Sequence, residues 1–240
     1  RFHNYFFPFT EGFDYAVAND FDSVRRKADE TTCAVMMELI QGEGGVLPLD
    51  REFVQQVEAL CREKDILLII DEVQTGIGRT GSLFCFQQYG IRPDVVTMAK
   101  GLGGGVPVGA VLAAESCSNV LTPGTHATTF GGTPIVCAAA NAVLDTVGDG
   151  QFLEKVKEKG EYLKNGILSI GSPNILGVRG MGLMLAIIVE DGKHAAYANK
   201  LLEKGVIGLT AGKNAVRLLP PLTISKEEMD EALTIMKEVF

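Results

Sequence analysis

An alternation of short apolar runs with amphipathic segments through the first half of the chain most constrains what it can fold into. Residues 51–64 carry apolar side chains at the 3.6-residue period of a helix, and Asp50 stands where a helix cap is expected. Buried strands are predicted by the apolar runs at 32–38, 66–70, 94–99 and 106–114. This alternation predicts an α/β fold with a mostly parallel sheet.

The pattern changes near residue 148. An Ala-rich helix is predicted from Pro134 to about Val147, and a polar amphipathic helix follows Gly150. Short strands (175–179 and 182–189) alternate with helices (195–204 and 225–240) after residue 171, and Ser225 with Glu228 forms a capping-box pattern. We therefore predict a large domain over residues 1–147 and a small α+β domain over residues 148–240.

Composition excludes several classes of partner. The 22 Lys and Arg residues against 30 Asp and Glu give a formal charge of −8 without a basic block, so nucleic acid is not an expected partner. No apolar run reaches the length of a membrane span, so no membrane is expected. The five cysteines are scattered and only three histidines accompany them, which predicts no metal site and reduced thiols in a cytoplasmic location.

Polar side chains that follow two of the predicted strands are the first candidates for chemistry. Asp71 comes directly after the run 66–70, and Lys100 follows the run 94–99 and precedes four glycines among five residues. Ligands of open α/β sheets collect at the carboxyl ends of the strands. A partly desolvated lysine there can form a Schiff base with a carbonyl, and a neighbouring aspartate can keep a pyridinium nitrogen protonated. A surface Lys–Asp pair remains the alternative from these two residues alone.

The run of residues 76–81 (GIGRTG) matches the G-x-G-x-x-G pattern of dinucleotide-binding loops. Five residues rich in polar groups separate it from the preceding strand, and no strand-end acid lies about 20 residues beyond it. We therefore do not expect a dinucleotide site.

Five ordered motifs bring in a family resemblance. They are residues 41–45 (QGEGG), 68–81 (LIIDEVQTGIGRTG), 99–110 (AKGLGGGVPVGA), 126–132 (HATTFGG) and 217–222 (RLLPPL). In this order they resemble the class III, ornithine-type, pyridoxal-phosphate-dependent aminotransferases, and most of all their acetylornithine branch. The resemblance implies the fold type I of such enzymes, with a large domain that is incomplete at its N-terminal side. It also implies that the chain, which begins at Arg1 rather than Met, is a C-terminal piece whose isolated form is a poor catalyst.

The resemblance also assigns roles to residues of the cofactor site. It implies that Lys100 binds pyridoxal phosphate covalently and that Asp71 pairs with its pyridine nitrogen. Gln74 would donate a hydrogen bond to the phenolic oxygen of the cofactor. Thr129 would reach the cofactor phosphate of the other subunit, which implies a homodimer. Without the resemblance, Gln74 and Thr129 would be interpreted as ordinary loop residues.

Two further residues correspond to the substrate site of the family. Arg217 would bind the substrate α-carboxylate, and Glu43 would pair with Arg217 and swing aside when a dicarboxylate arrives. The implied reaction moves the δ-amino group of an N-acylated ornithine, N-acetylornithine in arginine biosynthesis, to 2-oxoglutarate. Ornithine, N-succinyl-diaminopimelate and 4-aminobutyrate remain alternative donors. An aminomutase and a non-catalytic truncated fragment remain alternative functions.

Overall fold

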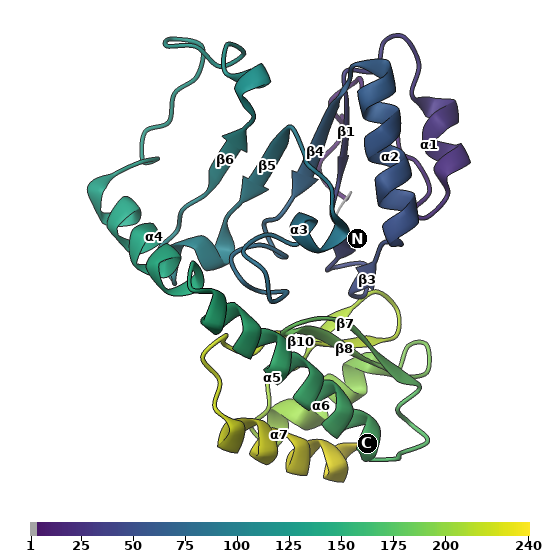
Figure 1. Cartoon of the computed structure of the whole chain (residues 1–240). Helices are drawn as coiled ribbons and strands as arrows, with labels where there is room; N and C mark the ends of the chain where they lie inside the picture. Colours follow the sequence, from purple (N-terminus) through teal and green to yellow (C-terminus); the bar gives the residue numbers. More distant parts are fainter. Residues whose placement is uncertain (1–3) are drawn as a thin grey trace.

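A computed structural model describes residues 4–240 of the chain, and its helices and strands alternate through the first half (Figure 1). The strands of this half are β1 (Ala34–Met37), β2 (Ile40–Gln41), β3 (Leu47–Pro48), β4 (Leu67–Asp71), β5 (Val95–Met98) and β6 (Ala110–Ala113). Its helices are α1 (Phe21–Lys27), α2 (Arg51–Lys64), α3 (Phe86–Tyr89) and α4 (Pro134–Val147), with the 3-10 turns η1 (Lys100–Gly103) and η2 (Glu115–Cys117). The predicted helices at 51–64 and 134–147 are confirmed to the residue.

The first sheet has the strand order β1-β4-β5-β6. Strands β1, β4 and β5 run parallel, whereas β6 pairs antiparallel with β5 at the edge, so the predicted mostly parallel sheet is confirmed. Register pairs Met37 with Ile70, and Asp71 with Thr97. Because parallel strands end at the same edge of a sheet, the residues at and just beyond the ends of β1, β4 and β5 lie together there.

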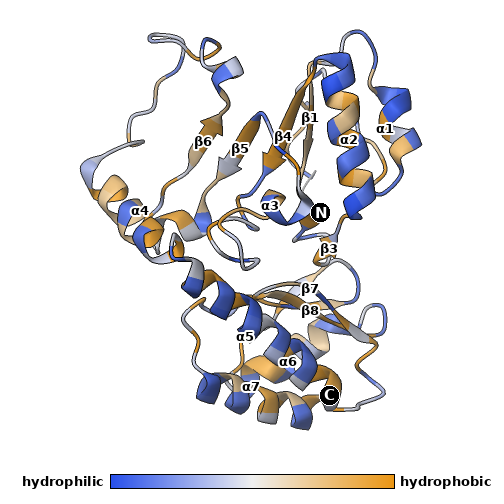
Figure 2. Cartoon of the chain, viewed as in Figure 1, coloured by the Kyte–Doolittle hydropathy of each residue, from blue (hydrophilic) through white to orange (hydrophobic). Residues whose placement is uncertain are grey.

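Helix α2 covers the first sheet with one apolar face. Its buried side chains, Phe53, Val54, Val57, Leu60 and Cys61, share a core with Leu68 and Ile70 of β4. Figure 2 shows this division as apolar strands beside helices that are apolar on one side and polar on the other. Asp50 stands at the N-cap as predicted, but its side chain makes no capping hydrogen bond. The predicted position of the cap is therefore confirmed, but the hydrogen bond expected of a capping side chain is not formed.

The second half forms a four-stranded antiparallel sheet with the order β7-β8-β10-β9. Its elements are α5 (Gly150–Ser169), β7 (Gly177–Met181), β8 (Met184–Ile188), α6 (His194–Glu203), β9 (Leu209–Ala211), β10 (Ala215–Leu218) and α7 (Lys226–Val239). The three helices lie on one side of this sheet (Figure 1). The capping box of Ser225 and Glu228 at the start of α7 is confirmed. None of the helices in residues 4–240 is long and apolar enough to cross a membrane.

The other side of the second sheet packs against the first half of the chain. Met184 and Ala186 of β8 and Ala215 of β10 belong to the same buried cluster as α2 and β4. Helix α4 ends at Val147 and α5 begins at Gly150, so the chain crosses from the first half to the second at residues 148–149. The domain division at 147/148 stays a prediction. The shared core brings the end of β10 close to the carboxyl edge of the first sheet.

Candidate active site

Asp71 occupies the carboxyl edge of the first sheet as the last residue of β4. Its Oδ1 accepts hydrogen bonds from the Val73 N–H at 2.9 Å and from the Thr97 hydroxyl at 3.3 Å. Both donors reach the same oxygen, and no group within residues 4–240 hydrogen-bonds Oδ2. The carboxylate is therefore held in place through one oxygen, while the other oxygen is still able to accept a hydrogen bond.

Lys100 follows the end of β5 in a strained backbone conformation. Its φ of +45° lies in the left-handed region, which a residue with a Cβ rarely adopts. No hydrogen bond or ion pair among the described residues engages its amine. The residue lines a cavity of about 280 Å³ together with Gln74, Ile77 and Val143. An unpaired lysine on a strained backbone beside a cavity is typical of a functional site.

Arg217 on β10 brings the second half of the chain to this edge. Its Nη1 lies 2.7 Å from Glu43 Oε1 and donates a hydrogen bond of 3.2 Å to Gln74 Oε1. The arginine is only 6% exposed, and its Nε is buried without a hydrogen-bond partner. The Glu43 side chain, in contrast, is 53% exposed. A buried guanidinium with one unsatisfied N–H and a solvent-accessible partner can exchange that partner for an incoming carboxylate.

The turn that carries Glu43 is held at its backbone from three directions. The Glu43 carbonyl accepts the Gly212 N–H at 2.9 Å, and the Gly45 carbonyl accepts Arg179 Nε at 2.8 Å. Gly212 has a φ of +57°, and an added Cβ would stand 2.4 Å from the Gly44 carbonyl oxygen. From the first sheet, Glu38 Oε2 accepts the Gly42 N–H at 3.2 Å. The backbone of the turn is thus fixed while the Glu43 side chain stays accessible.

Glu38, which directly follows β1, is a site residue that was not predicted from the sequence. Burial raises the pKa of its carboxyl, the Gly42 N–H opposes this, and the negative charge of Asp71 adds to the rise. Lys100 and Glu43 also act electrostatically on Glu38, so these charged groups lie near the same sheet edge. The signal was available, since Glu38 ends a predicted strand just as Asp71 does.

Glu72, the neighbour of Asp71, has a structural role. It is fully buried, and it accepts hydrogen bonds from the Thr75 hydroxyl and from the Phe86 N–H. Burial raises the pKa of its carboxyl. Glu72 therefore holds the loop after β4 against the start of α3 through these two hydrogen bonds.

Thr129 lies apart from these residues. It is exposed on the stretch between η2 and α4, residues 118–133, and no interaction joins it to Lys100 or Asp71 among the described residues. Figure 1 shows that stretch beyond β6, at the edge of the first sheet that lies farthest from β1 and α2. Its role toward a neighbouring subunit stays a prediction.

The G-x-G-x-x-G run at 76–81 does not form a dinucleotide-binding loop. Residues 73–80 are a succession of turns, and no helix opens at the glycines. Arg79 instead donates from Nη1 to the carbonyls of Leu183 at 3.0 Å and Pro220 at 2.6 Å. Burial lowers the pKa of this guanidinium to about 10. The run therefore serves to dock the two halves of the chain.

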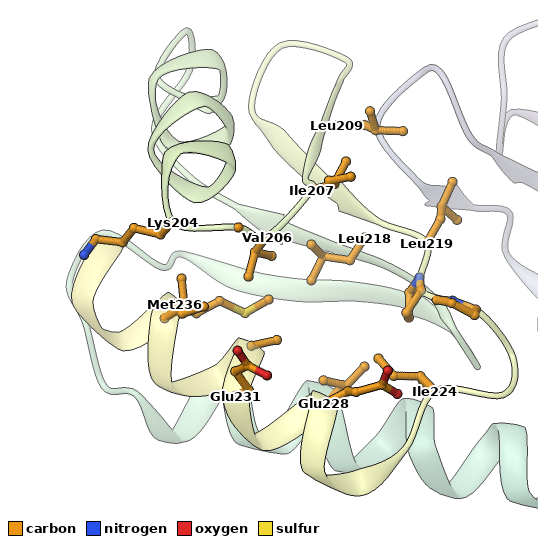
Figure 3. Close-up of a pocket in the computed structure, with 16 residues that line it drawn as sticks. Lys204, Val206, Ile207, Leu209, Leu218, Leu219, Ile224, Glu228, Glu231 and Met236 are labelled. Carbon is orange, nitrogen blue, oxygen red and sulfur yellow. The ribbon is translucent and has the colours of Figure 1, made fainter.

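The larger cavity lies elsewhere. An apolar groove of about 520 Å³ runs between α7, the end of β10 and residues 204–209 (Figure 3). Its charged members are Lys204, Glu228 and Glu231, and two of them are engaged, because Lys204 pairs with Glu238 and Glu228 completes the cap of α7. No cluster of three or more His, Cys, Asp and Glu side chains suited to a metal occurs in the described residues. Within residues 4–240, the side chains predicted for chemistry thus lie outside this groove.

The fold and the site define the class: the chain has the fold type I of pyridoxal-phosphate-dependent transferases. The family model described as aminotransferase class-III matches residues 3–240. The chain therefore belongs to the class III aminotransferases, and the resemblance seen in the sequence is confirmed.

Within this family, the chain is similar to individual acetylornithine aminotransferases. The chain is 47% identical to the acetylornithine aminotransferase of Aquifex aeolicus and 45% identical to that of Haemophilus ducreyi, in both cases over 241 residues and 100% of this chain. These matches cover 62% and 60% of the relatives. The chain thus spans about three fifths of the length of the curated relatives that it matches.

Solved structures agree with this assignment. The N-acetylornithine aminotransferase of Stenotrophomonas maltophilia superposes with a TM-score of 0.88 at 34% identity, over 96% of this chain and 62% of that one. An ornithine aminotransferase of Toxoplasma gondii, described with partial occupancy of pyridoxal phosphate at its active site, gives 0.92 at 34% identity, over 99% and 57%. The fold therefore does not separate acetylornithine from ornithine as the donor.

Proposed function

We propose that the chain carries the lysine half of the active site of an acetylornithine aminotransferase, which moves the δ-amino group of N-acetylornithine to 2-oxoglutarate. The observation that carries this proposal is the convergence of Lys100, Asp71 and the Arg217–Glu43 pair at one edge of the sheet. The curated relatives at 43–47% identity support the choice of donor.

The residues present fit pyridoxal phosphate. Lys100 offers an unpaired amine beside a cavity, and Asp71 Oδ2 is free to accept a hydrogen bond from the N–H of a pyridinium ring. The cofactor, when bound, supplies an aldehyde carbon and a conjugated ring that accepts an electron pair. Lys100 Nζ would hold that carbon covalently. Once the amino substrate has displaced Lys100, the free lysine amine would move a proton at the substrate carbon. The Asp71 carboxylate would keep the ring nitrogen protonated throughout.

Arg217 and Glu43 would sort the two substrates. An amino donor that places no carboxylate beside Arg217 leaves the pair with Glu43 intact at 2.7 Å. A dicarboxylate such as 2-oxoglutarate would displace the exposed Glu43 side chain and accept hydrogen bonds from the guanidinium N–H groups, for which the unsatisfied Nε–H is available. Gln74, which contacts Arg217, would link the carboxylate site to the phenolic oxygen of the cofactor.

We also propose a homodimer as the working form. Exposed large apolar side chains are carried by three consecutive segments, β6, residues 118–133 and the start of α4: Val111, Leu112, Val120, Leu121, Phe130 and Ile135. Exposed apolar side chains gathered on consecutive segments favour a protein partner, and a second copy is the commonest one. Thr129 is exposed within the second of these segments, which supports its proposed reach to the neighbouring site.

The covalent step gives the direct test. The protein is mixed with pyridoxal phosphate, reduced with borohydride and digested, and the pyridoxyl group is located by mass spectrometry. We expect it on Lys100 and expect Lys100→Arg to abolish it, whereas the control Lys64→Arg, at the exposed end of α2, leaves it unchanged. Label spread over surface lysines in place of Lys100 would refute the proposal.

Ornithine is the second candidate donor, because solved ornithine aminotransferases superpose as well as the acetylornithine enzyme does. A panel of N-acetylornithine and ornithine, each with 2-oxoglutarate, separates the two. We expect N-acetylornithine to give the higher kcat/KM in a protein of the full length of the relatives that carries this chain.

A further inference from the structure

Glu38 is a half-buried carboxylate to which the proposed reaction gives no role. It leaves the end of β1 beside Asp71, because the register that pairs Met37 with Ile70 puts these two residues next along neighbouring parallel strands. Its Oε2 accepts the Gly42 N–H at 3.2 Å. Withdrawing a carboxylate from water costs free energy unless the carboxylate is hydrogen-bonded, so the partner of Glu38 indicates its role.

The N–H that Glu38 accepts belongs to the residue directly before Glu43. Gly42 is buried, and its carbonyl in turn accepts the N–H groups of Gly45 at 3.3 Å and Val46 at 3.2 Å, which closes the turn. The other contacts that hold the Glu43 turn, from Gly212 and Arg179, come from the second half of the chain. Among these contacts, Glu38 alone links the turn to the sheet edge that carries Asp71 and Lys100.

We propose that Glu38 is a positioning residue of this site, whose carboxylate fixes the Gly42 N–H and thereby aims the Glu43 side chain at Arg217. The inference rests on the proposed function, because it assigns Glu38 to the exchange of substrates at Arg217. With the turn anchored, Glu43 leaves and returns by side-chain rotation alone. Without the anchor the turn shifts, and the pair with Arg217 forms less often.

The two half-reactions need Glu43 in opposite ways, which makes the role measurable. The amino donor needs the Glu43–Arg217 pair formed, whereas 2-oxoglutarate needs it broken. Loss of the anchor in Glu38→Ala therefore raises KM for the donor by about tenfold and leaves KM for 2-oxoglutarate unchanged or lower, since a hydrogen bond to a charged acceptor is worth about one such factor. Glu38→Gln keeps an oxygen that accepts the Gly42 N–H, so it restores the ratio of the two KM values.

Hydrogen–deuterium exchange supplies a readout that does not depend on turnover. The amides of residues 38–46 are followed by mass spectrometry in the wild type, Glu38→Ala and Glu38→Gln. We expect faster exchange, by about tenfold, in Glu38→Ala alone. Glu63→Ala, an exposed position on α2 without a side-chain partner in the described residues, is the matched control. If Glu38→Ala fails to fold, Glu38→Asp, which withdraws the oxygen by one methylene, replaces it.

The outcomes separate the two proposals. A wild type without transamination in a protein of full length refutes the proposed function, while the exchange data still report on the anchor. An active wild type in which Glu38→Ala exchanges and reacts like the control overturns the inference about Glu38. So does a Glu38→Gln variant that behaves like Glu38→Ala, because the charge rather than the hydrogen bond would then be what matters.

Discussion

A single methyl group at Gly42 tests the carboxylate site without touching a proposed reactive residue. A Cβ at this position would stand 2.4 Å from Gln74 Oε1 and 2.6 Å from Gln74 Nε2. Ordinary contact begins at 3.4 Å, so the Gln74 amide must withdraw by about 1 Å in Gly42→Ala. The atoms in the way belong to the far end of a flexible side chain, and the φ of Gly42 is open to alanine, so the backbone keeps its course.

The expected loss of carboxylate affinity follows from the hydrogen bond that Gln74 loses. Its hydrogen bond to Arg217 Nη1 is already 3.2 Å long, and a withdrawal of this size breaks it. A hydrogen bond to a charged group contributes about 1.5–3 kcal/mol, and the length of this one places it at the lower end, which is about tenfold in affinity. The free energy of unfolding should change by less than about 1 kcal/mol, because only a side chain moves. Function and stability should therefore respond separately.

Calorimetric titration with glutarate, a dicarboxylate that cannot react, measures the affinity, and urea unfolding measures the stability. Gly177→Ala is the matched control, since a Cβ at Gly177 meets nothing within 4 Å. We expect Gly42→Ala to bind glutarate about tenfold more weakly than this control at nearly equal stability. Unchanged glutarate affinity in Gly42→Ala would refute the position that we assign to Gln74.

Two further predictions concern charge. Asp71→Ala should chiefly lower kcat, whereas Arg217→Ala should chiefly raise KM for 2-oxoglutarate. The rise corresponds to about 2 kcal/mol of binding free energy, the low end for a buried ion pair, because Glu43, the partner of Arg217, is half exposed. Identical kinetic profiles of the two variants would contradict the separate roles. Burial raises the pKa of Glu72, so the native state holds that proton more tightly than the unfolded chain and the free energy of unfolding falls as pH rises from about 4.5 through the native pKa. Urea midpoints between pH 4 and 8 should show a smaller fall in Glu72→Gln than in Glu63→Gln, and equal slopes would argue against a protonated Glu72.

Much of the fold was predictable because its signals are local. Helix α2 follows from one apolar face, and α7 follows from its capping box, so neither needs knowledge of the rest of the chain. The direction of β6 was not determined by its apolar run, since parallel and antiparallel edge strands have similar side chains. The small hairpin of β2 and β3, two residues in each strand, is too short to leave a pattern.

The site was predictable only in part, for a similar reason. Asp71 and Lys100 follow from the rule that polar residues at strand ends face the ligand edge of a parallel sheet. The same rule applies to Glu38, the last residue of the predicted strand at 32–38, but apolar Leu39 and Ile40 follow it, whereas a second carboxylate, Glu72, follows Asp71. The contact of Arg217 with Gln74 joins residues 143 positions apart, and without a family resemblance nothing in the sequence indicates it.

The separation of Arg217 and Glu43 along the chain also says what the carboxylate site depends on. The guanidinium stands on the second sheet and its carboxylate on a turn of the first half, so the pair exists only while the two halves are packed. Gly212 permits the close approach, because a side chain there would strike the Gly44 carbonyl, and Arg79 secures it through two carbonyls of the second half. Any change that separates the halves by an ångström therefore weakens carboxylate binding before it alters Lys100 or Asp71, since both of these belong to the first sheet.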